Sequence, residues 1–127
     1  MLKKHLPVEQ QNSEYSSLDE SLRQCRAETA LERFNAISHI LKAMSEVHEK
    51  RALQDIFLQV KVLILDESLS MKNVAIDVLG ELALRKKTGF TKPVLGLLEK
   101  LKNDKYPAIR KKSSILKTKI VKIQNTV

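Results

Sequence analysis

Three histidines and one cysteine are the side chains best suited to catalysis or metal binding in this chain: His5, His39, His48 and Cys25. A cysteine nucleophile needs a histidine as its base, and a zinc site needs Cys and His ligands at short, regular spacing. The sequence has neither pattern, because these four residues are scattered and neither an HExxH motif nor a Gly-rich phosphate loop occurs. We therefore predict that the chain is not an enzyme and that it uses no cofactor and no metal ion.

Positive charge is the second chemical feature, and it is concentrated in the last third of the chain. The whole chain carries a net charge of +8, with 23 Lys and Arg against 15 Asp and Glu. Residues 85–127 contain thirteen basic and two acidic residues, a local charge of +11, whereas residues 1–84 sum to −3. Such asymmetry indicates an acidic partner for the C-terminal half. The alternative is a solvated helix face with cations at the helix ends.

The basic residues near the C-terminus form the predicted partner surface, which consists of Lys111, Lys112, Lys117, Lys119 and Lys122. On a helical wheel they spread around most of the face opposite the apolar stripe, which is too broad for a DNA groove. Aromatic residues for stacking on RNA bases are also scarce in this half. We expect an acidic protein partner, with non-specific nucleic-acid binding as the alternative. A membrane-surface helix over 107–123 is disfavoured because that segment has no Trp or Phe.

Apolar residues recur at helical spacing through most of the chain, which predicts an all-α protein. Capping signals divide the pattern, with "SLDE" at Ser17, "TALE" at Thr29, a serine of "DESLS" and Thr91 as predicted N-caps. Gly89 is expected to end the fourth helix in a left-handed conformation. The predicted helices cover about 18–28, 30–47, 50–65, from "DESLS" to "RKKTG", from Thr91 to "NDKYP", and 107–123. Because no Gly or Pro lies near residue 28, one continuous helix over 18–47 is an alternative.

Residues 1–16 are polar, and we predict a mobile tail that precedes a single helical domain over 17–127. The N-terminus has no apolar run of the kind that a signal peptide needs, and no segment is apolar enough to span a membrane. The single cysteine fits a reducing compartment. These features favour the cytoplasm, with the nucleus as the alternative.

The turn before the last helix, "DKYPAIR", resembles the inter-helix turn of a HEAT repeat. Asp104, Pro107, Ile109 and Arg110 match the family pattern, and "NVAIDVLGELA" at 73–83 resembles the second helix of such a repeat. A shift of 37 positions superposes the apolar stripe of residues 50–87 on the following segment, and it places Glu67 and Asn73 as the weaker counterparts of Asp104 and Arg110. The resemblance covers about residues 50–122.

The resemblance implies three antiparallel helical hairpins stacked as a short HEAT-like α-solenoid. It also implies a ladder along the inner turns, in which an Asp caps the second helix of a hairpin and an Arg of a neighbouring repeat bonds to it. The expected ladder residues are Asp66, Asp104, Pro107 and Arg110. The implied function is a protein-interaction or scaffold module. A tubulin-binding module of the TOG class is a further alternative, although the acidic "DESLS" turn fits it poorly.

Overall fold

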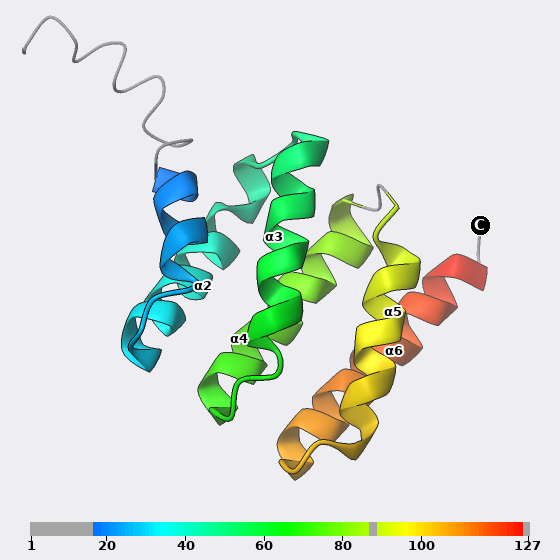
Figure 1. Cartoon of the computed structure of the whole chain (residues 1–127). Helices are drawn as coiled ribbons and strands as arrows, with labels where there is room; N and C mark the ends of the chain where they lie inside the picture. The colour runs from blue at the N-terminus through cyan, green and yellow to red at the C-terminus, as the bar shows by residue number, and fades with distance from the viewer. Residues whose placement is uncertain (1–16, 87–88, 126–127) are drawn as a thin grey trace, which may run out of the picture.

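The computed structural model describes residues 17–86 and 89–125, and its regular elements are all helical (Figure 1). A short helix covers residues 17–24. The following helices are α2 (Ala30–Ala43), α3 (Lys50–Leu63), α4 (Leu69–Gly80), α5 (Thr91–Lys100) and α6 (Pro107–Asn125). Single 3-10 turns at Met44–Glu46 and Leu101–Asn103 extend α2 and α5, and a π-helical stretch at Glu81–Lys86 extends α4. The described part contains no strand, which confirms the all-α prediction, and the predicted tail 1–16 lies outside it.

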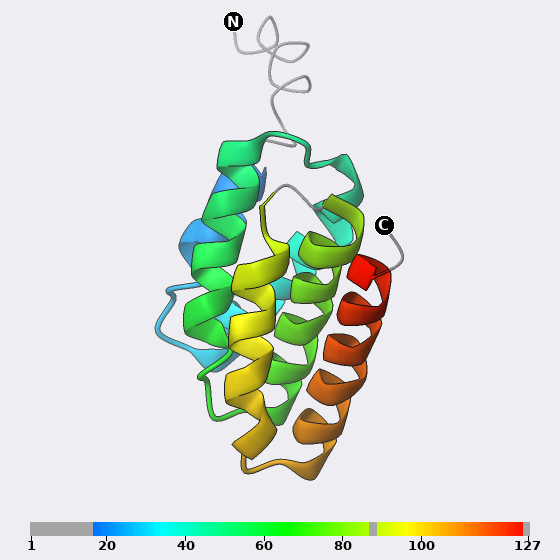
Figure 2. The same ribbon diagram turned by 90° about the vertical axis from the view of Figure 1, so that its right-hand side faces the viewer.

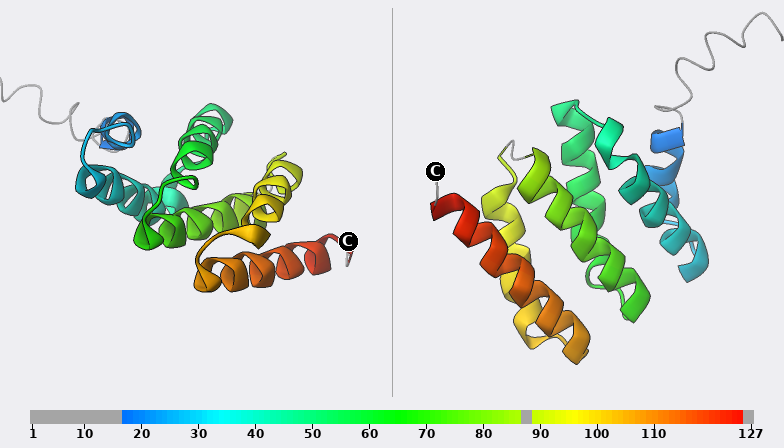
Figure 3. Two further views of the ribbon diagram at one scale, coloured as in Figure 1. Left: turned by 60° about the horizontal axis from the view of Figure 1, so that its bottom comes forward. Right: turned by 180° about the vertical axis from the view of Figure 1, so that it is seen from behind.

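The helices form two layers. Helix 17–24, α3 and α5 lie in front in Figure 1, and α2, α4 and α6 run side by side behind them, as the right panel of Figure 3 shows. The edge view in Figure 2 shows α5 and α6 together at one end of the molecule. Among the described elements, α4 is the central helix, because it contacts α2, α3 and α6. None of the described helices is long and apolar enough to cross a membrane.

The central position of α4 explains why its apolar face is wider than the sequence suggested. Helical spacing predicts a buried stripe of Met71, Ala75, Val78 and Leu82 for α4, and these residues are buried, but Ile76, Leu79 and Ala83 are buried as well. A helix that is packed on several sides needs apolar residues around most of its circumference. One continuous cluster of buried side chains results, and it extends from Leu18 in the first helix to Ile120 in α6.

Local capping signals account for several helix boundaries. The Thr29 hydroxyl accepts a hydrogen bond from the Glu32 backbone N–H, and the Ser68 hydroxyl accepts one from Met71. The Thr29 cap and the non-helical residues 25–29 show that residues 18–47 do not form one continuous helix. Gly89 has a φ of 79°, the left-handed conformation that was predicted for it.

Three local predictions are wrong. The first helix ends at residue 24 rather than near 28, and Ser17 lies inside it instead of capping it. Thr91 is the first residue of α5, whose N-cap is Phe90 without a side-chain cap bond. Helical spacing over residues 50–65 also predicts that Phe57 is buried in the middle of the apolar stripe, but Phe57 is only half-buried, and its ring lies 6.0 Å from that of Phe90.

Candidate functional site

Two inter-helix turns have the same hydrogen-bonding arrangement around an aspartate. Asp66 Oδ1 accepts from the Ser68 backbone N–H at 2.7 Å, and Asp104 Oδ2 accepts from the Tyr106 backbone N–H at 3.0 Å. Each aspartate lies three residues before the first residue of the next helix. An Asp that bonds to the backbone two residues on stabilises a tight turn, so each carboxylate fixes the entry of the chain into α4 or α6.

The second oxygen of each carboxylate binds a cation from the preceding helix of the same layer. Arg33 of α2 lies 3.3 Å from Asp66, and Lys72 of α4 pairs with Asp104. Arg33 and Lys72 are each the fourth residue of their helix, and Arg110 holds the same place in α6. The repeating distance between these cations is therefore 39 and then 38 positions.

This geometry corrects the repeat alignment inferred from the sequence. The counterparts of Asp104 and Arg110 are Asp66 and Lys72, rather than Glu67 and Asn73, and a 37-residue shift is one position short. The apolar stripe set the 37-residue shift, whereas residue type agrees with a shift of 38, which places Asp66 on Asp104 and the basic Lys72 on Arg110.

Arg110 and Pro107 stabilise the last turn itself. Arg110 Nη1 donates to the Asp104 carbonyl at 2.6 Å, as Arg33 Nη1 donates to the Ala27 carbonyl six residues before it at 2.8 Å. Arg110 therefore bonds to the turn that begins its own helix. The predicted ladder had placed it against the turn of a neighbouring repeat. Pro107 is the first residue of α6, a position where its missing N–H costs no hydrogen bond.

The Lys72–Asp104 pair is the most buried ion pair among the described residues, with side chains only 8% and 7% exposed. Burial alone would raise the pKa of the Asp104 carboxyl. The hydrogen bonds from Lys72 and the Tyr106 N–H, together with the Lys72 charge, outweigh burial and hold this pKa below its usual range. The pair thus ties α4 to the turn before α6 with both charges in place.

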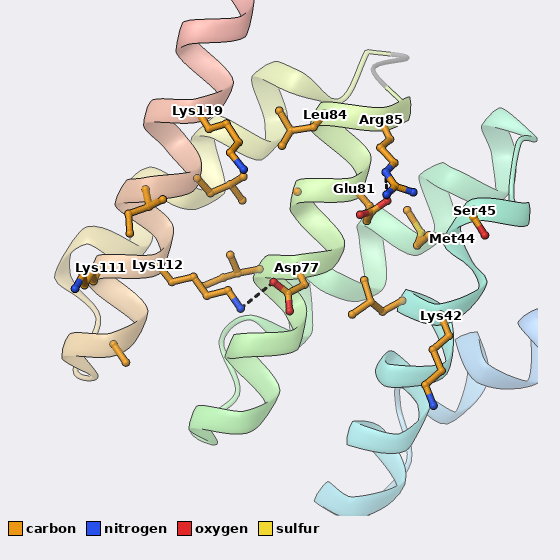
Figure 4. A pocket seen from close by; sticks show the side chains of 16 residues that line it. Lys42, Met44, Ser45, Asp77, Glu81, Leu84, Arg85, Lys111, Lys112 and Lys119 are labelled. Carbon is orange, nitrogen blue, oxygen red and sulfur yellow. Dashed lines mark ion pairs between the residues drawn. The ribbon is translucent and has the colours of Figure 1, made fainter.

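A groove of about 830 Å³ crosses the layer formed by α2, α4 and α6 (Figure 4). Its apolar lining comes from all three helices, namely Leu41, Met44, Ile76, Gly80, Leu84, Ala108, Ile115 and Leu116. Its charged lining consists of Lys42, Asp77, Glu81, Arg85, Lys111, Lys112 and Lys119. A concave apolar surface with a few charged groups is typical of a binding site.

The acidic groups of the groove are neutralised inside the protein. Asp77 pairs with Lys112 at 2.8 Å, and Glu81 pairs with Arg85 at 3.2 Å, as the dashed lines in Figure 4 show. The remaining charged residues, Lys42, Lys111 and Lys119, are exposed and form no ion pair within the described ranges. The groove therefore offers three positive charges that are available to a ligand.

The five lysines predicted as a partner surface do not share one face. Lys111, Lys112 and Lys119 line the groove, but Lys112 is engaged with α4 through Asp77 and Asn73. Lys117 pairs with Glu99 of α5, away from the groove, and Lys122 is exposed outside it. The third exposed lysine of the groove is Lys42, which the count of C-terminal charges could not identify because it lies in α2.

The Lys117 contact belongs to a small surface cluster. The carboxylate of Glu99 accepts hydrogen bonds from both Lys102 and Lys117, and these bonds and the two positive charges lower its pKa to about 2. This cluster joins α5 to α6 on the protein surface. Lys117 is therefore engaged in an ion pair on the side of α6 that faces α5, and it does not line the groove.

The residues first considered for chemistry take structural places. His39 Nδ1 lies 2.6 Å from the Ser21 hydroxyl, and its Nε2 lies 3.3 Å from that of Ser17, which ties the first helix to α2. Cys25 is buried, and burial raises the pKa of its thiol to about 11. His48 lines a cavity together with His39 and Ser17, and His5 falls outside the described residues. Within the described ranges, no three His, Cys, Asp or Glu side chains gather as a metal site would require.

Comparison of this chain with protein-family models, with curated proteins and with solved structures found no match. Its function is therefore inferred from the groove and the turns themselves. The sequence signal that would have located these turn contacts is the basic residue at the fourth position of α2, α4 and α6, at 33, 72 and 110. The groove has no comparable signal, since its three available lysines come from two helices that are distant in the sequence.

Proposed function

We propose that this chain is a non-enzymatic protein-interaction module of HEAT-like architecture, and that its groove engages an acidic surface of another protein. The observation that carries the proposal is the groove across α2, α4 and α6. Its apolar floor is surrounded by Lys42, Lys111 and Lys119, which form no ion pair with other residues that the structure describes. Unpaired cations around a concave apolar surface are complementary to a ligand that is both acidic and apolar.

The repeated turn contacts support the HEAT-like arrangement. Arg33 reaches Asp66 and Lys72 reaches Asp104, so each helix of the back layer is joined to the turn that starts the next one. The same helix position, the same aspartate offset and nearly the same residue period recur in both contacts. This is the pattern expected of stacked hairpins that contact only their neighbours.

The composition of α6 supports a terminal place for the last hairpin. The eighth and eleventh residues of α2 and α4 are Ile37, Ile40, Ile76 and Leu79, and all four are buried. In α6 the same positions are polar and are not buried, namely Ser114 and Lys117. A terminal repeat needs such a polar outer face, because no further repeat covers it. The partner is therefore expected on the groove rather than on this end.

The apolar floor favours a protein over a nucleic acid. Binding by phosphate contacts requires many cations and gives no gain from an exposed apolar surface. The groove offers three available lysines around eight apolar or glycine residues, one of which, Ile115, is 57% exposed. A partner that covers these side chains gains from their burial in addition to the ion pairs.

The test is an affinity capture with the full chain and two charge-reversal variants, with and without nuclease. Lys111→Glu/Lys119→Glu reverses two of the three available groove charges, and Lys61→Glu/Lys100→Glu makes the same change in net charge on α3 and α5 outside the groove. Lys112 is left intact because it holds α4 and α6 together. We expect a protein partner that resists nuclease, is lost with the groove variant and is kept with the control. Capture that disappears on nuclease treatment would contradict the proposal and favour nucleic-acid binding.

A further inference from the structure

One wall of the groove has a regular pattern of charge and apolar surface. Lys111, Ile115 and Lys119 of α6 are spaced four residues apart, all three line the groove, and all three are exposed. The two lysines are eight residues apart, which is about 12 Å along a helix. An exposed isoleucine thus lies between two unpaired cations on the same wall.

The other parts of the groove extend this pattern across α4. Gly80 contributes no side chain to the floor, and the half-buried Leu41 of α2 and Leu84 beyond α4 flank it. The third available cation, Lys42, lies on the α2 side, opposite Lys111 and Lys119 (Figure 4). A ligand that rests on α4 would therefore meet apolar side chains beneath it and positive charge on both sides.

From this arrangement we infer that the groove binds one amphipathic α-helix of the partner, and that the face of this helix that contacts α6 carries an apolar pair with one acidic residue before it and one after it along the helix. On the edge that faces α6, two carboxylates seven residues apart would match Lys111 and Lys119, because residues at that spacing share a face and lie about 10.5 Å apart. Apolar residues three and four positions after the first carboxylate would cover Ile115. This inference deepens the proposed function and rests on it.

Helical structure in the ligand follows from the groove walls. All three walls are helices whose backbone N–H and C=O groups are used internally, so an extended peptide would find no strand edge with which to pair. A polyproline ligand requires an aromatic-lined groove, and none of the sixteen lining residues is aromatic. A helix satisfies its own backbone and needs only side-chain contacts, which is what these walls offer.

The first experiment measures the binding of synthetic peptides to the full chain by fluorescence anisotropy. The matched probe is a helical peptide with Glu at positions i and i+7 and Leu at i+3 and i+4. The shifted probe has the same composition and helicity, but its Glu residues lie on the face opposite the Leu residues. We expect the matched probe to bind at least about tenfold more tightly than the shifted probe. Equal affinities would overturn the inference, because charge alone would then account for binding.

The second experiment tests the apolar contact with neutral substitutions. Ile115→Gln removes an apolar side chain from the groove wall, whereas Val121→Gln changes an α6 residue that is 37% exposed and lies outside the groove lining. We expect Ile115→Gln to weaken binding of the matched probe by about tenfold and Val121→Gln to leave it within about twofold. Unchanged affinity in Ile115→Gln, with a melting curve like that of the unaltered chain, would overturn the inference.

The outcomes of these experiments separate the inference from the proposed function. If Lys111→Glu/Lys119→Glu loses the captured partner while the two probes bind equally, the acidic-partner function stands and the helical ligand is wrong. If the matched probe is preferred but partner capture ignores the charge reversal, the helix-binding groove stands and the proposed function is wrong.

Discussion

The contact that most directly links the helices of the back layer is the buried pair of Lys72 and Asp104, and its removal should be costly. We consider Lys72→Met, which keeps most of the apolar stem, Asp104→Ala, and the double variant. Loss of one partner of a buried ion pair leaves the other charge uncompensated, at a cost of about 3–5 kcal/mol. Asp104→Ala belongs in this range because it also removes the acceptor of the Tyr106 N–H, a bond of 3.0 Å.

Lys72→Met should cost less than Asp104→Ala. The remaining Asp104 carboxylate keeps its bond from the Tyr106 N–H, so we expect the free energy of unfolding to fall by about 2–3 kcal/mol. In the double variant no charge is left buried and unpaired. Its loss should therefore lie below that of Asp104→Ala alone, which corresponds to a coupling energy of at least about 2 kcal/mol between the two sites.

The assay is urea unfolding at fixed ionic strength, followed by circular dichroism. Arg33 and Asp66 provide the matched comparison, because they hold the same places one turn earlier but are 25% and 14% exposed. Their coupling energy should be smaller, about 1 kcal/mol, since solvent screens the charges. If the Lys72 and Asp104 losses add to within about 0.5 kcal/mol, the two residues are not coupled and the reasoning fails.

Three further predictions concern the core, one turn and the pH dependence of stability. Phe57→Ala should cost about 2–3 kcal/mol, below the usual range for a fully buried Phe because this ring is half-buried; in urea unfolding, a loss under about 1 kcal/mol would show that its contact with Phe90 contributes little. Gly89→Ala should lower thermal stability by about 1–2 kcal/mol, since φ is 79° and no atom crowds the site; an unchanged melting temperature would contradict this backbone argument. The lowered pKa of Asp104 stabilises the fold above about pH 4, its unfolded value, and this contribution is lost as the pH falls through the folded value. Asp104→Asn should therefore lose less stability than the unaltered chain as the pH falls below about 4, and equal losses in urea titrations would refute the assignment.

Much of the fold follows from local signals in the sequence. Thr29, Ser68 and Gly89 mark helix ends because each acts on the backbone within a few residues of itself. The apolar stripes are predictable for the same reason, since helical spacing alone decides which side chains share a face. Thr91 is the exception, because no local signal separates the first helical residue from the one before it.

The contacts between distant segments could not be predicted in the same way. Lysine is a residue type that usually lies on the surface. Lys72 is a buried ion-pair partner only because Asp104 lies opposite it, three residues before α6. Lys117 and Lys119 are the same residue type, but Lys117 pairs with Glu99 and Lys119 lines the groove. Such differences depend on which helix lies opposite, and residue type carries no information about that.

The central proposal is that the groove binds the partner. NMR mapping of the matched acidic peptide on the isotopically labelled full chain tests it most directly. Backbone amide shifts are followed as the peptide is added, with the shifted peptide as the control. We predict that the perturbed amides cluster on the groove lining of α2, α4 and α6, around Lys42, Gly80 and Ile115, and that the shifted peptide perturbs them only weakly. Perturbations centred on α3 and α5, with the groove amides unchanged, would contradict it.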